Sequence, residues 1–255
     1  MLFLDMAPYR PFRPMGTTCL KRPIREKRVI WQRPEPMLHR NGRFIGRLLE
    51  LKDVAAAAEL WRQAYSEVYG SAHDFLLFPE KIPGKVAMVE TWESDALTKP
   101  CLMLVAEEMA TGRLGAATLM TKYDRNLQIE YTFAGTHPEF RRQGLMNILG
   151  SMMHRTALAS GAEYLTTFLE TWHTITQAHT LRRGQGWKIA GIFPGNFTRW
   201  VRDQEEYRAC EIYLYKFINE GEKYATQPEE WHLHPGLAKL WNVMEEINQR
   251  LADET

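Results

Sequence analysis

The sequence predicts a mixed α/β protein in which helices cover a sheet that is mostly antiparallel. Apolar stretches with the length of strands alternate with stretches whose apolar residues recur three and four positions apart, which is the period of an amphipathic helix. The expected order of elements is β-α-α-β-β-β-α-β-α-β-β, a pattern typical of a sheet with helices on its faces. An apolar content of 45% and a charged content of 25% are ordinary for a globular protein.

Seven segments have the composition of strands. We expect them over residues 44–51, 101–108, 113–124, 127–136, 163–170, 187–193 and 209–218. The turn at Thr111–Gly112 separates the second segment from the third and predicts an antiparallel hairpin.

Five segments have helical periodicity. The first follows Asp53, the expected N-cap, and ends at Gly70; the second runs from Pro83 to Trp92. The third begins at residue 145 and ends at Gly161, and the fourth covers residues 174–186. The last begins at Pro235, and we expect its apolar face to pack on the core or on a second subunit, which leaves a homodimer open. That face contains Leu237, Leu240, Trp241, Met244, Ile247 and Leu251.

We divide the chain into a basic, Pro/Arg-rich N-terminal extension (1–42), a core domain (43–220) and a C-terminal helical extension (221–255). Residues 1–47 carry 11 Lys/Arg and 3 Asp/Glu, whereas the whole chain has a net charge of +1. A basic segment can bind nucleic acid, an anionic surface or an acidic partner. We expect an extended, loosely packed arm instead, and no nucleic-acid partner.

The composition excludes several classes of protein. Cys19, Cys101 and Cys210 are widely spaced, which argues against a disulfide framework and a thiolate zinc site and favours a reducing cytosol. His232 and His234 lack the further ligands that a metal needs, so we expect no metal. No apolar run approaches the roughly 18 residues of a membrane span. We therefore expect a cytoplasmic protein that does not enter a membrane.

The segment from Thr136 to Gly161 predicts a phosphate-binding loop. An expected strand ends near Gly135, and a short polar turn with Gly144 leads into a helix. Main-chain N–H groups and the helix dipole at such a turn attract an anion, and glycine lets it approach the backbone closely. Arg141 and Arg142 add positive charge, so a pyrophosphate fits this loop.

This loop resembles the signature of the GNAT superfamily, Gln/Arg-x-x-Gly-x-Gly/Ala after Pro-x-Tyr/Phe. The chain reads Pro138-Glu139-Phe140-Arg141-Arg142-Gln143-Gly144-Leu145-Met146, and only Met146 departs from the signature. Gly186-Trp187 before a strand is similar to the family's Gly-Phe. The resemblance extends from about residue 43 to residue 218. It implies a GNAT-like fold and an N-acyltransferase that moves an acyl group from acetyl-CoA, or another acyl-CoA, to a small-molecule or protein amine.

The resemblance also implies where acyl-CoA binds. The pyrophosphate would lie on the N–H groups of residues 142–147, and the pantetheine arm would lie between strands that separate near residues 132–135 and 165–169. Gln177, four residues after His173, resembles a further cofactor-binding position, although it could equally cap its helix. The implied cofactor-binding residues are Thr132, Phe133, Ala134, Gly135, Thr136, Arg141, Arg142, Gln143, Gly144, Leu145, Met146, Asn147 and Gln177.

Acyl transfer to an amine requires a base, because an ammonium has no lone pair. Glu130 lies 14 residues before Gly144, the spacing of the glutamate base in the histone-acetyltransferase branch. A glutamate that merely faces solvent from the strand is the alternative. A main-chain N–H near Phe133 or Ala134 would stabilise the oxyanion.

For the general acid the family often has a tyrosine, where this chain has Arg182. His179 is our candidate for that role. Tyr131, Tyr164 and His173 are the alternatives. Because a fold does not determine a function, a non-catalytic acyl-CoA sensor or interaction module on the same scaffold remains the competing hypothesis.

Overall fold

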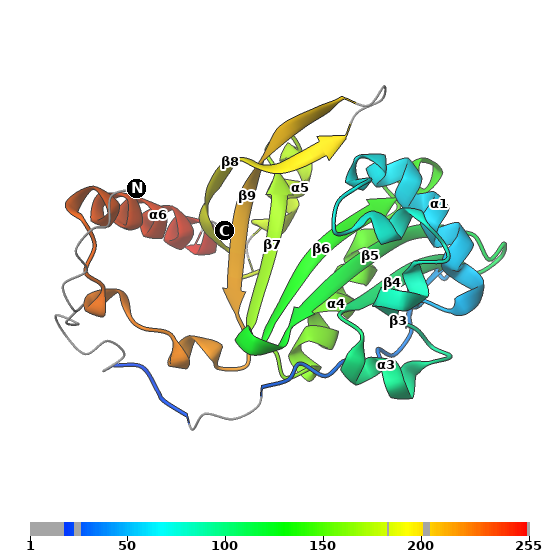
Figure 1. The fold of residues 1–255 in the computed structure, drawn as a ribbon, viewed down its shortest axis with the longest axis horizontal. Helices are drawn as coiled ribbons and strands as arrows, with labels where there is room; N and C mark the ends of the chain where they lie inside the picture. The colour runs from blue at the N-terminus through cyan, green and yellow to red at the C-terminus, as the bar shows by residue number, and fades with distance from the viewer. Residues whose placement is uncertain (1–17, 23–26, 183, 201–204, 254–255) are drawn as a thin grey trace, which may run out of the picture.

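A computed structural model describes residues 18–22, 27–182, 184–200 and 205–253, and Figure 1 shows their arrangement. These residues form a twisted nine-stranded sheet in the order β1-β2-β4-β5-β6-β7-β9-β8, with β3 paired on β4. All neighbouring strands are antiparallel except the pairs β3–β4 and β6–β7. The strands are β1 (Met37–Leu38), β2 (Phe44–Leu48), β3 (Val86–Ala87), β4 (Cys101–Glu108), β5 (Leu114–Tyr123), β6 (Gln128–Thr136), β7 (Tyr164–Glu170), β8 (Lys188–Trp200) and β9 (Glu206–Phe217).

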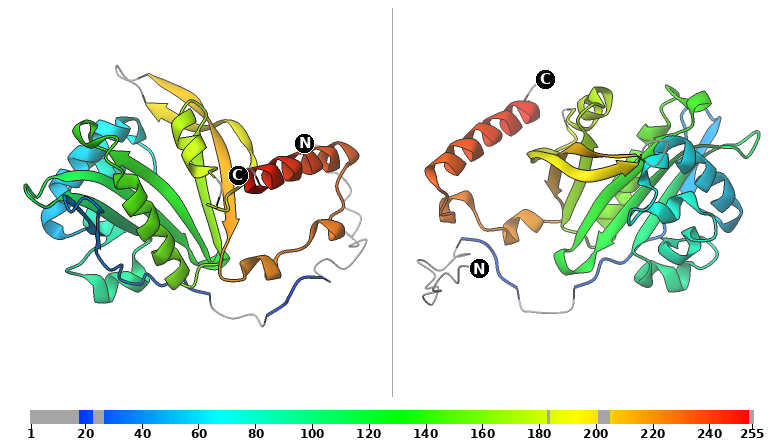
Figure 2. Two further views of the ribbon diagram at one scale, coloured as in Figure 1. Left: turned by 180° about the vertical axis from the view of Figure 1, so that it is seen from behind. Right: turned by 45° about the horizontal axis from the view of Figure 1, so that its top comes forward.

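Helices cover the two faces of this sheet. The helices are α1 (Val54–Tyr65), α2 (Ile82–Lys85), α3 (Trp92–Thr98), α4 (Leu145–Ala159), α5 (Thr174–Thr180) and α6 (Pro235–Asp253). Helix α1 lies on one face, whereas α4 and α5 lie on the opposite face, as the rear view in Figure 2 shows. The predicted mixed α/β fold with a mostly antiparallel sheet is therefore confirmed.

Each face of the sheet has its own apolar core. On the α4 face, Leu149 and Met152 of the helix pack with Leu104 and Met120 of the sheet. On the α1 face, Trp61 is fully buried among residues of the central strands and of the short 3-10 helix Asp74–Leu77. The helical periodicity that predicted α1 and α4 thus reflects one buried stripe on each helix.

Part of the N-terminal segment belongs to the core, so the expectation of a loosely packed arm is wrong for residues 29–31. Val29 and Trp31 are 0% and 1% exposed and lie in the α4-side core. The indole Nε1 of Trp31 donates to the carbonyl of Lys99 at 3.0 Å, and Nζ of Lys122 donates to the carbonyl of Val29 at 2.8 Å. Two apolar residues at alternating positions anchor a segment that is otherwise basic. Residues 1–17 and 23–26 lie outside the described residues.

The second expected helix, from Pro83 to Trp92, is wrong. The chain instead forms the short α2, strand β3 and then α3. The two residues of β3 are fully buried and pair in parallel with Cys101 and Leu102 of β4, because tertiary pairing outweighs local helix propensity there. Helix α3 starts where the carboxylate of Asp95 accepts hydrogen bonds from the hydroxyl of Thr91 and the main-chain N–H of Met88.

The expected N-cap at Asp53 also differs in the structure. Its carboxylate forms an ion pair with Arg47 and accepts a hydrogen bond from the main-chain N–H of Glu50 at 2.9 Å, without capping α1. Helix α1 ends at Tyr65, five residues before the expected end, and continues as the 3-10 helix Ser66–Val68. The expected fourth helix shortens to α5, and β8 extends to Trp200, seven residues further than expected.

Helix α6 forms where it was expected, but its apolar face does not pack on the core. Leu237, Leu240 and Ile247 are 54%, 55% and 43% exposed, and Figure 1 shows α6 beyond the β8 edge of the sheet. The side chain of Asn248 attaches the helix to that edge: its Oδ1 accepts from the N–H of Ile189 at 2.7 Å and its Nδ2 donates to the same residue's carbonyl at 3.1 Å. Among the described residues, no helix is long and apolar enough to cross a membrane.

Candidate functional site

Strands β6 and β7 separate in the middle of the sheet. Their parallel pairing runs from Gln128 and Tyr164 to Tyr131 and Thr167, and beyond this point β6 pairs with β5 and β7 with β9. The two strands diverge like the arms of a V in Figure 1. The hydroxyl of Thr167 donates to the carbonyl of Tyr131 at 2.9 Å and closes the apex. The opening leaves main-chain groups on both strand edges that an extended ligand with amides can pair with.

A bulge in β6 lies at this apex. The pairing with β5 shifts between Leu119 and Met120, so that Thr132 has no partner in the ladder. Its hydroxyl forms a hydrogen bond with the hydroxyl of Thr121 at 2.7 Å. The bulge directs the following residues of β6 away from β7.

The phosphate-binding loop has the geometry of an anion site. The short 3-10 helix Pro138–Phe140 follows β6, and Arg142 and Gly144 both adopt left-handed conformations, with φ of 60° and 76°, before α4 begins. Among the described residues, no acceptor is bonded to the amides of Gly144, Leu145 and Met146. Arg141 and Arg142 are exposed beside them. Amides without an acceptor among the described residues, a helix N-terminus and two guanidinium groups favour a phosphate ligand.

Two residues of the loop differ in detail from the expectation. The amide of Asn147 donates to the carbonyl of Gly144 at 3.0 Å, so it is already engaged. The side chain of Met146, which departs from the GNAT signature, packs against the α4-side core. The loop therefore accommodates a methionine where the signature has a small residue. Gln143 lies in the turn itself and receives a hydrogen bond from Nη1 of Arg43 at 3.1 Å.

The free end of β6 packs against α1. A Cβ atom at Gly135 would lie 3.1 to 3.3 Å from Ala64, Leu60 and Trp61, so the absence of a side chain allows the helix to approach the strand. The ring of Phe133 also packs against Trp61. The hydroxyl of Tyr65 donates to the carbonyl of Ala134 at 3.0 Å. Thr136 ends the strand.

Glu130 lies on β6 one residue before the apex, opposite Thr121 and Thr166. Its Oε2 accepts a hydrogen bond from the hydroxyl of Tyr123 at 3.2 Å. Burial raises the pKa of the Glu130 carboxyl, the Tyr123 hydrogen bond lowers it, and the negative charge of Glu211 raises it again. A carboxylate with a raised pKa beside the apex has the property that a general base requires.

Tyrosine hydroxyls form a network next to this carboxylate. The pKa of Tyr213 responds to the hydroxyls of Tyr164 and of Thr166, the neighbour of Glu130 across the parallel ladder, so these hydroxyls lie near one another. Burial raises the pKa of Tyr213, and the charge of Glu130 adds to this effect. Tyr164 is among the alternative acids expected from the sequence, whereas Tyr123 and Tyr213 are not. Tyr123 is paired with Gln128 and Tyr213 with Phe168, so their approach to Glu130 depends on strand register, which no local motif reports.

The structure does not bring His179 to Glu130. Helix α5 lies on the α4 face of the sheet, His179 is exposed, and Glu130 faces the α1 side with Thr121. Nε2 of Gln177 donates to the carbonyls of Glu170 and Thr171, at 2.8 and 3.0 Å, so its side chain ties α5 to the end of β7 and does not cap the helix. Tyr131 is also directed to the α4 face, where it packs against Trp187.

A buried charge cluster lies at the far end of β7. Arg199 of β8 is 3% exposed and forms ion pairs with Glu170 and Glu67, and Glu211 lies 4.0 Å away. The cluster connects the β8–β9 hairpin to β7 and to the segment after α1. The sequence does not predict this cluster, because the expected strand 187–193 ends before Arg199.

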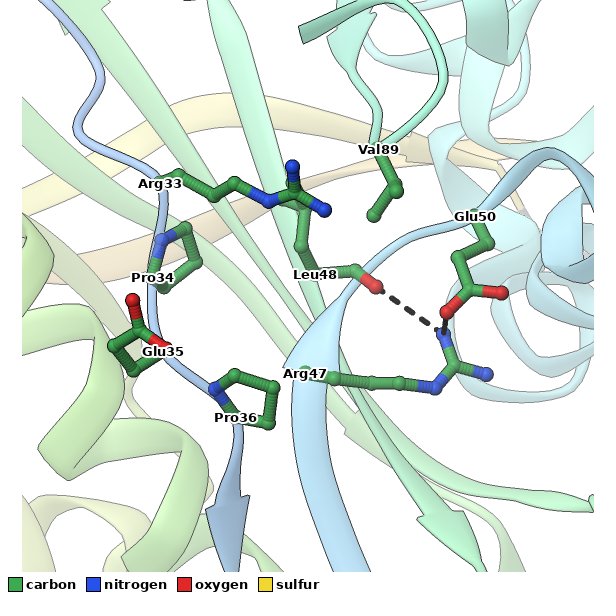
Figure 3. Close-up of a pocket in the computed structure, with 8 residues that line it drawn as sticks. All are labelled: Arg33, Pro34, Glu35, Pro36, Arg47, Leu48, Glu50 and Val89. Carbon is green, nitrogen blue, oxygen red and sulfur yellow. Dashed lines mark hydrogen bonds and ion pairs between the residues drawn. The ribbon is translucent and has the colours of Figure 1, made fainter.

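A pocket of about 390 Å³ lies elsewhere, between residues 33–36 and the edge of β2. Figure 3 shows its lining, with Arg47 directed toward Glu50. Arg47 is engaged by Asp53, Glu107 and the carbonyl of Leu48, and none of the predicted site residues lines this pocket. The site at the separation of β6 and β7 is therefore distinct from it. Among the described residues, no group of three or more His, Cys, Asp or Glu could hold a metal ion.

No protein-family model matches the sequence, and no curated protein matches it significantly. Solved structures do match. A ribosomal-protein-S5-alanine acetyltransferase from Vibrio fischeri is 9% identical with a TM-score of 0.55, and the match covers 73% of this chain and 98% of that chain.

Two further structures match to a similar extent. An acetyltransferase of the GNAT family from Streptococcus pneumoniae is 18% identical with a TM-score of 0.51, over 69% of this chain and 99% of that one. The putative acetyltransferase yncA from Salmonella typhimurium, solved with its cofactor acetyl-CoA, is 17% identical with a TM-score of 0.51, over 69% and 95% of the two chains. The chain therefore has the fold of the GNAT N-acetyltransferases.

Proposed function

We propose that this protein is an acyl-CoA-dependent N-acyltransferase. The observation that carries the proposal has two parts: the amides of Gly144, Leu145 and Met146 have no acceptor among the residues that the structure describes, and β6 and β7 separate next to them. The amides suit a diphosphate, and the open strand edges suit the two amides of pantetheine. A GNAT-like fold, seen with acetyl-CoA in yncA, supports the same ligand.

In the proposed reaction, Glu130 accepts a proton from the ammonium or amine of the acceptor, directly or through a water molecule. The neutral amine then attacks the thioester carbonyl, the nitrogen of the tetrahedral intermediate loses its extra proton to water, and the C–S bond breaks with loss of the thiolate. A main-chain N–H of β6 near Phe133 stabilises the oxyanion. Burial of the Glu130 carboxyl raises its pKa, which makes it a stronger base than an exposed glutamate.

The thiolate requires a proton as it leaves, and we propose the tyrosine network in place of His179. Tyr213 and Tyr164 lie on the Glu130 side of the sheet, whereas His179 lies on a helix of the other side. The hydroxyl of Tyr213 can pass a proton through its contact with Tyr164 or Thr166.

We propose that the amine acceptor binds on the same face, over β7, β9 and β8. The rings of Phe168 and Tyr213 stack there with centroids 4.7 Å apart, and Phe193 of β8 packs edge-on against Tyr213 and is 43% exposed. A surface of this kind favours an acceptor with an apolar or aromatic part. Both a small molecule and a side chain of a protein fit this description.

The test is release of free thiol from acetyl-CoA by the purified chain in the presence of a mixture of amines. We expect release that depends on the amine, and loss of release in Glu130→Gln with acetyl-CoA binding retained. If the protein binds acetyl-CoA but acylates none of the amines, the result favours the alternative hypothesis of an acyl-CoA sensor. Absence of binding to any acyl-CoA would refute both.

A further inference from the structure

The imidazole of His39 lies beside the phosphate-binding loop, although it comes from the turn between β1 and β2. A Cβ atom at Gly144 would lie 3.3 Å from Nε2 of His39 and 3.6 Å from Nδ2 of Asn147. Two nitrogen-bearing side chains therefore flank the space that the missing side chain of Gly144 leaves open.

Arg43 fixes this turn against the loop. Nη1 of Arg43 donates to Oε1 of Gln143 at 3.1 Å, and its Nε donates to Oε1 of Glu108 at 2.7 Å. The main-chain N–H of His39 donates to the carbonyl of Phe44 at 2.8 Å across the turn. The position of the imidazole relative to Gly144 is thus held by both main-chain and side-chain contacts.

The His39 ring has no hydrogen-bond partner within the described residues. Its Nδ1 is buried without a partner, and its Nε2, the nitrogen beside Gly144, forms no hydrogen bond in the part of the chain that the structure describes. Among the described residues, the nearby amides of Gly144 to Met146 are donors that also have no acceptor. A ligand that presents several acceptor oxygens can accept hydrogen bonds from these amides and from the Nε2–H of His39 together.

We propose that His39 is a direct ligand of the diphosphate of acyl-CoA, with its Nε2–H donating to a phosphate oxygen next to Gly144. This inference rests on the proposed function. It makes the β1–β2 turn part of the cofactor site, although Gly144 is far away in the sequence. It also makes His39 a residue that selects donors with phosphate groups over pantetheine alone.

Calorimetry with three ligands tests this proposal. CoA carries the diphosphate and the 3′-phosphate, dephospho-CoA lacks the 3′-phosphate, and pantetheine lacks all phosphate and is measured by its competition with CoA. We expect His39→Ala to weaken CoA and dephospho-CoA by the same factor, about tenfold for one hydrogen bond to a charged group in a half-exposed site. Pantetheine should bind unchanged. His39→Gln, which keeps an N–H donor, should recover most of the affinity.

His154→Ala is the matched control. This half-exposed histidine lies on α4, ten residues after Gly144 and about 15 Å along the helix from it. The substitution should leave all three affinities unchanged. Loss of CoA affinity alone would place His39 at the 3′-phosphate and contradict the diphosphate contact. An equal loss for all three ligands, or no loss, would also overturn the proposal. A wild-type protein that binds none of them would refute the proposed function itself, whereas wild-type binding with an unaffected His39→Ala refutes only this inference.

Discussion

Two substitutions next to Glu130 should shift the acidic limb of the pH–rate profile in opposite directions. Activity requires the ionised carboxylate, so kcat/KM should rise with pH through the raised pKa of Glu130. The hydroxyl of Tyr123 stabilises the ionised form, and removing it in Tyr123→Phe should raise that pKa further. The charge of Glu211 disfavours the ionised form, so Glu211→Gln should lower the pKa.

The size of the first shift follows from the hydrogen bond. At 3.2 Å and in a partly open site, the contact between Tyr123 and Glu130 is worth about 1 kcal/mol. One pKa unit corresponds to 1.36 kcal/mol, so the limb should move up by about 0.7 pH unit in Tyr123→Phe. Glu130→Gln should lower kcat/KM by about 10² to 10⁴ at neutral pH, the usual contribution of a general base.

The assay is thiol release from acetyl-CoA at saturating amine, measured from pH 5 to pH 9 for the wild type and each variant. Calorimetry with CoA for each variant separates binding from chemistry. If both variants shift the limb in the same direction, or Glu130→Gln keeps the wild-type rate, Glu130 is not the base. The reasoning from burial and neighbouring charge would then fail as well.

Three further substitutions test packing. Gly135→Ala inserts a Cβ 3.1 to 3.3 Å from three residues of α1. This overpacking should lower the free energy of unfolding, measured by urea titration, by about 1 to 3 kcal/mol. An unchanged free energy would show that α1 can move. Arg199→Ala leaves Glu170 buried without its guanidinium partner, so the free energy of unfolding should fall by about 3 to 5 kcal/mol in the same titration. A fall of less than about 1 kcal/mol would mean that water enters the cluster. Asn248→Ala removes both hydrogen bonds to Ile189, so limited proteolysis should cut the C-terminal segment faster while the urea midpoint of the core stays the same; equal cutting rates would contradict this attachment.

The sequence was sufficient for the parts of the fold where one local pattern dominates. Strand β4 has the predicted bounds, and α4 begins at Leu145 as predicted and ends at Ala159, two residues before Gly161. Strand β3 could not be predicted, because Val86 and Ala87 form a strand only through their pairing with β4. The capping role expected of Asp53 failed because a buried arginine from β2 takes its carboxylate.

The candidate site also contains one part that forms a local sequence motif and another that depends on tertiary contacts. The proposed phosphate-binding loop is contiguous in sequence, so its glycine and its arginines form a motif that could be proposed from the sequence. The surroundings of Glu130 could not be predicted from the sequence. Tyr123 of β5 and Tyr213 of β9 come near Glu130 only because of how the strands pair. His39 was assigned to an N-terminal extension, because the sequence does not report that the β1–β2 turn folds back onto the loop.

Hydrogen exchange of the loop amides tests the central claim most directly. Without ligand, the amides of Gly144, Leu145 and Met146 have no acceptor among the described residues and should exchange fast. On addition of acetyl-CoA we predict protection of these three amides and of the open edge of β6, together with little change in the pocket beside β2. Fast exchange at the loop with saturating acetyl-CoA would contradict the diphosphate site on which the proposed function depends.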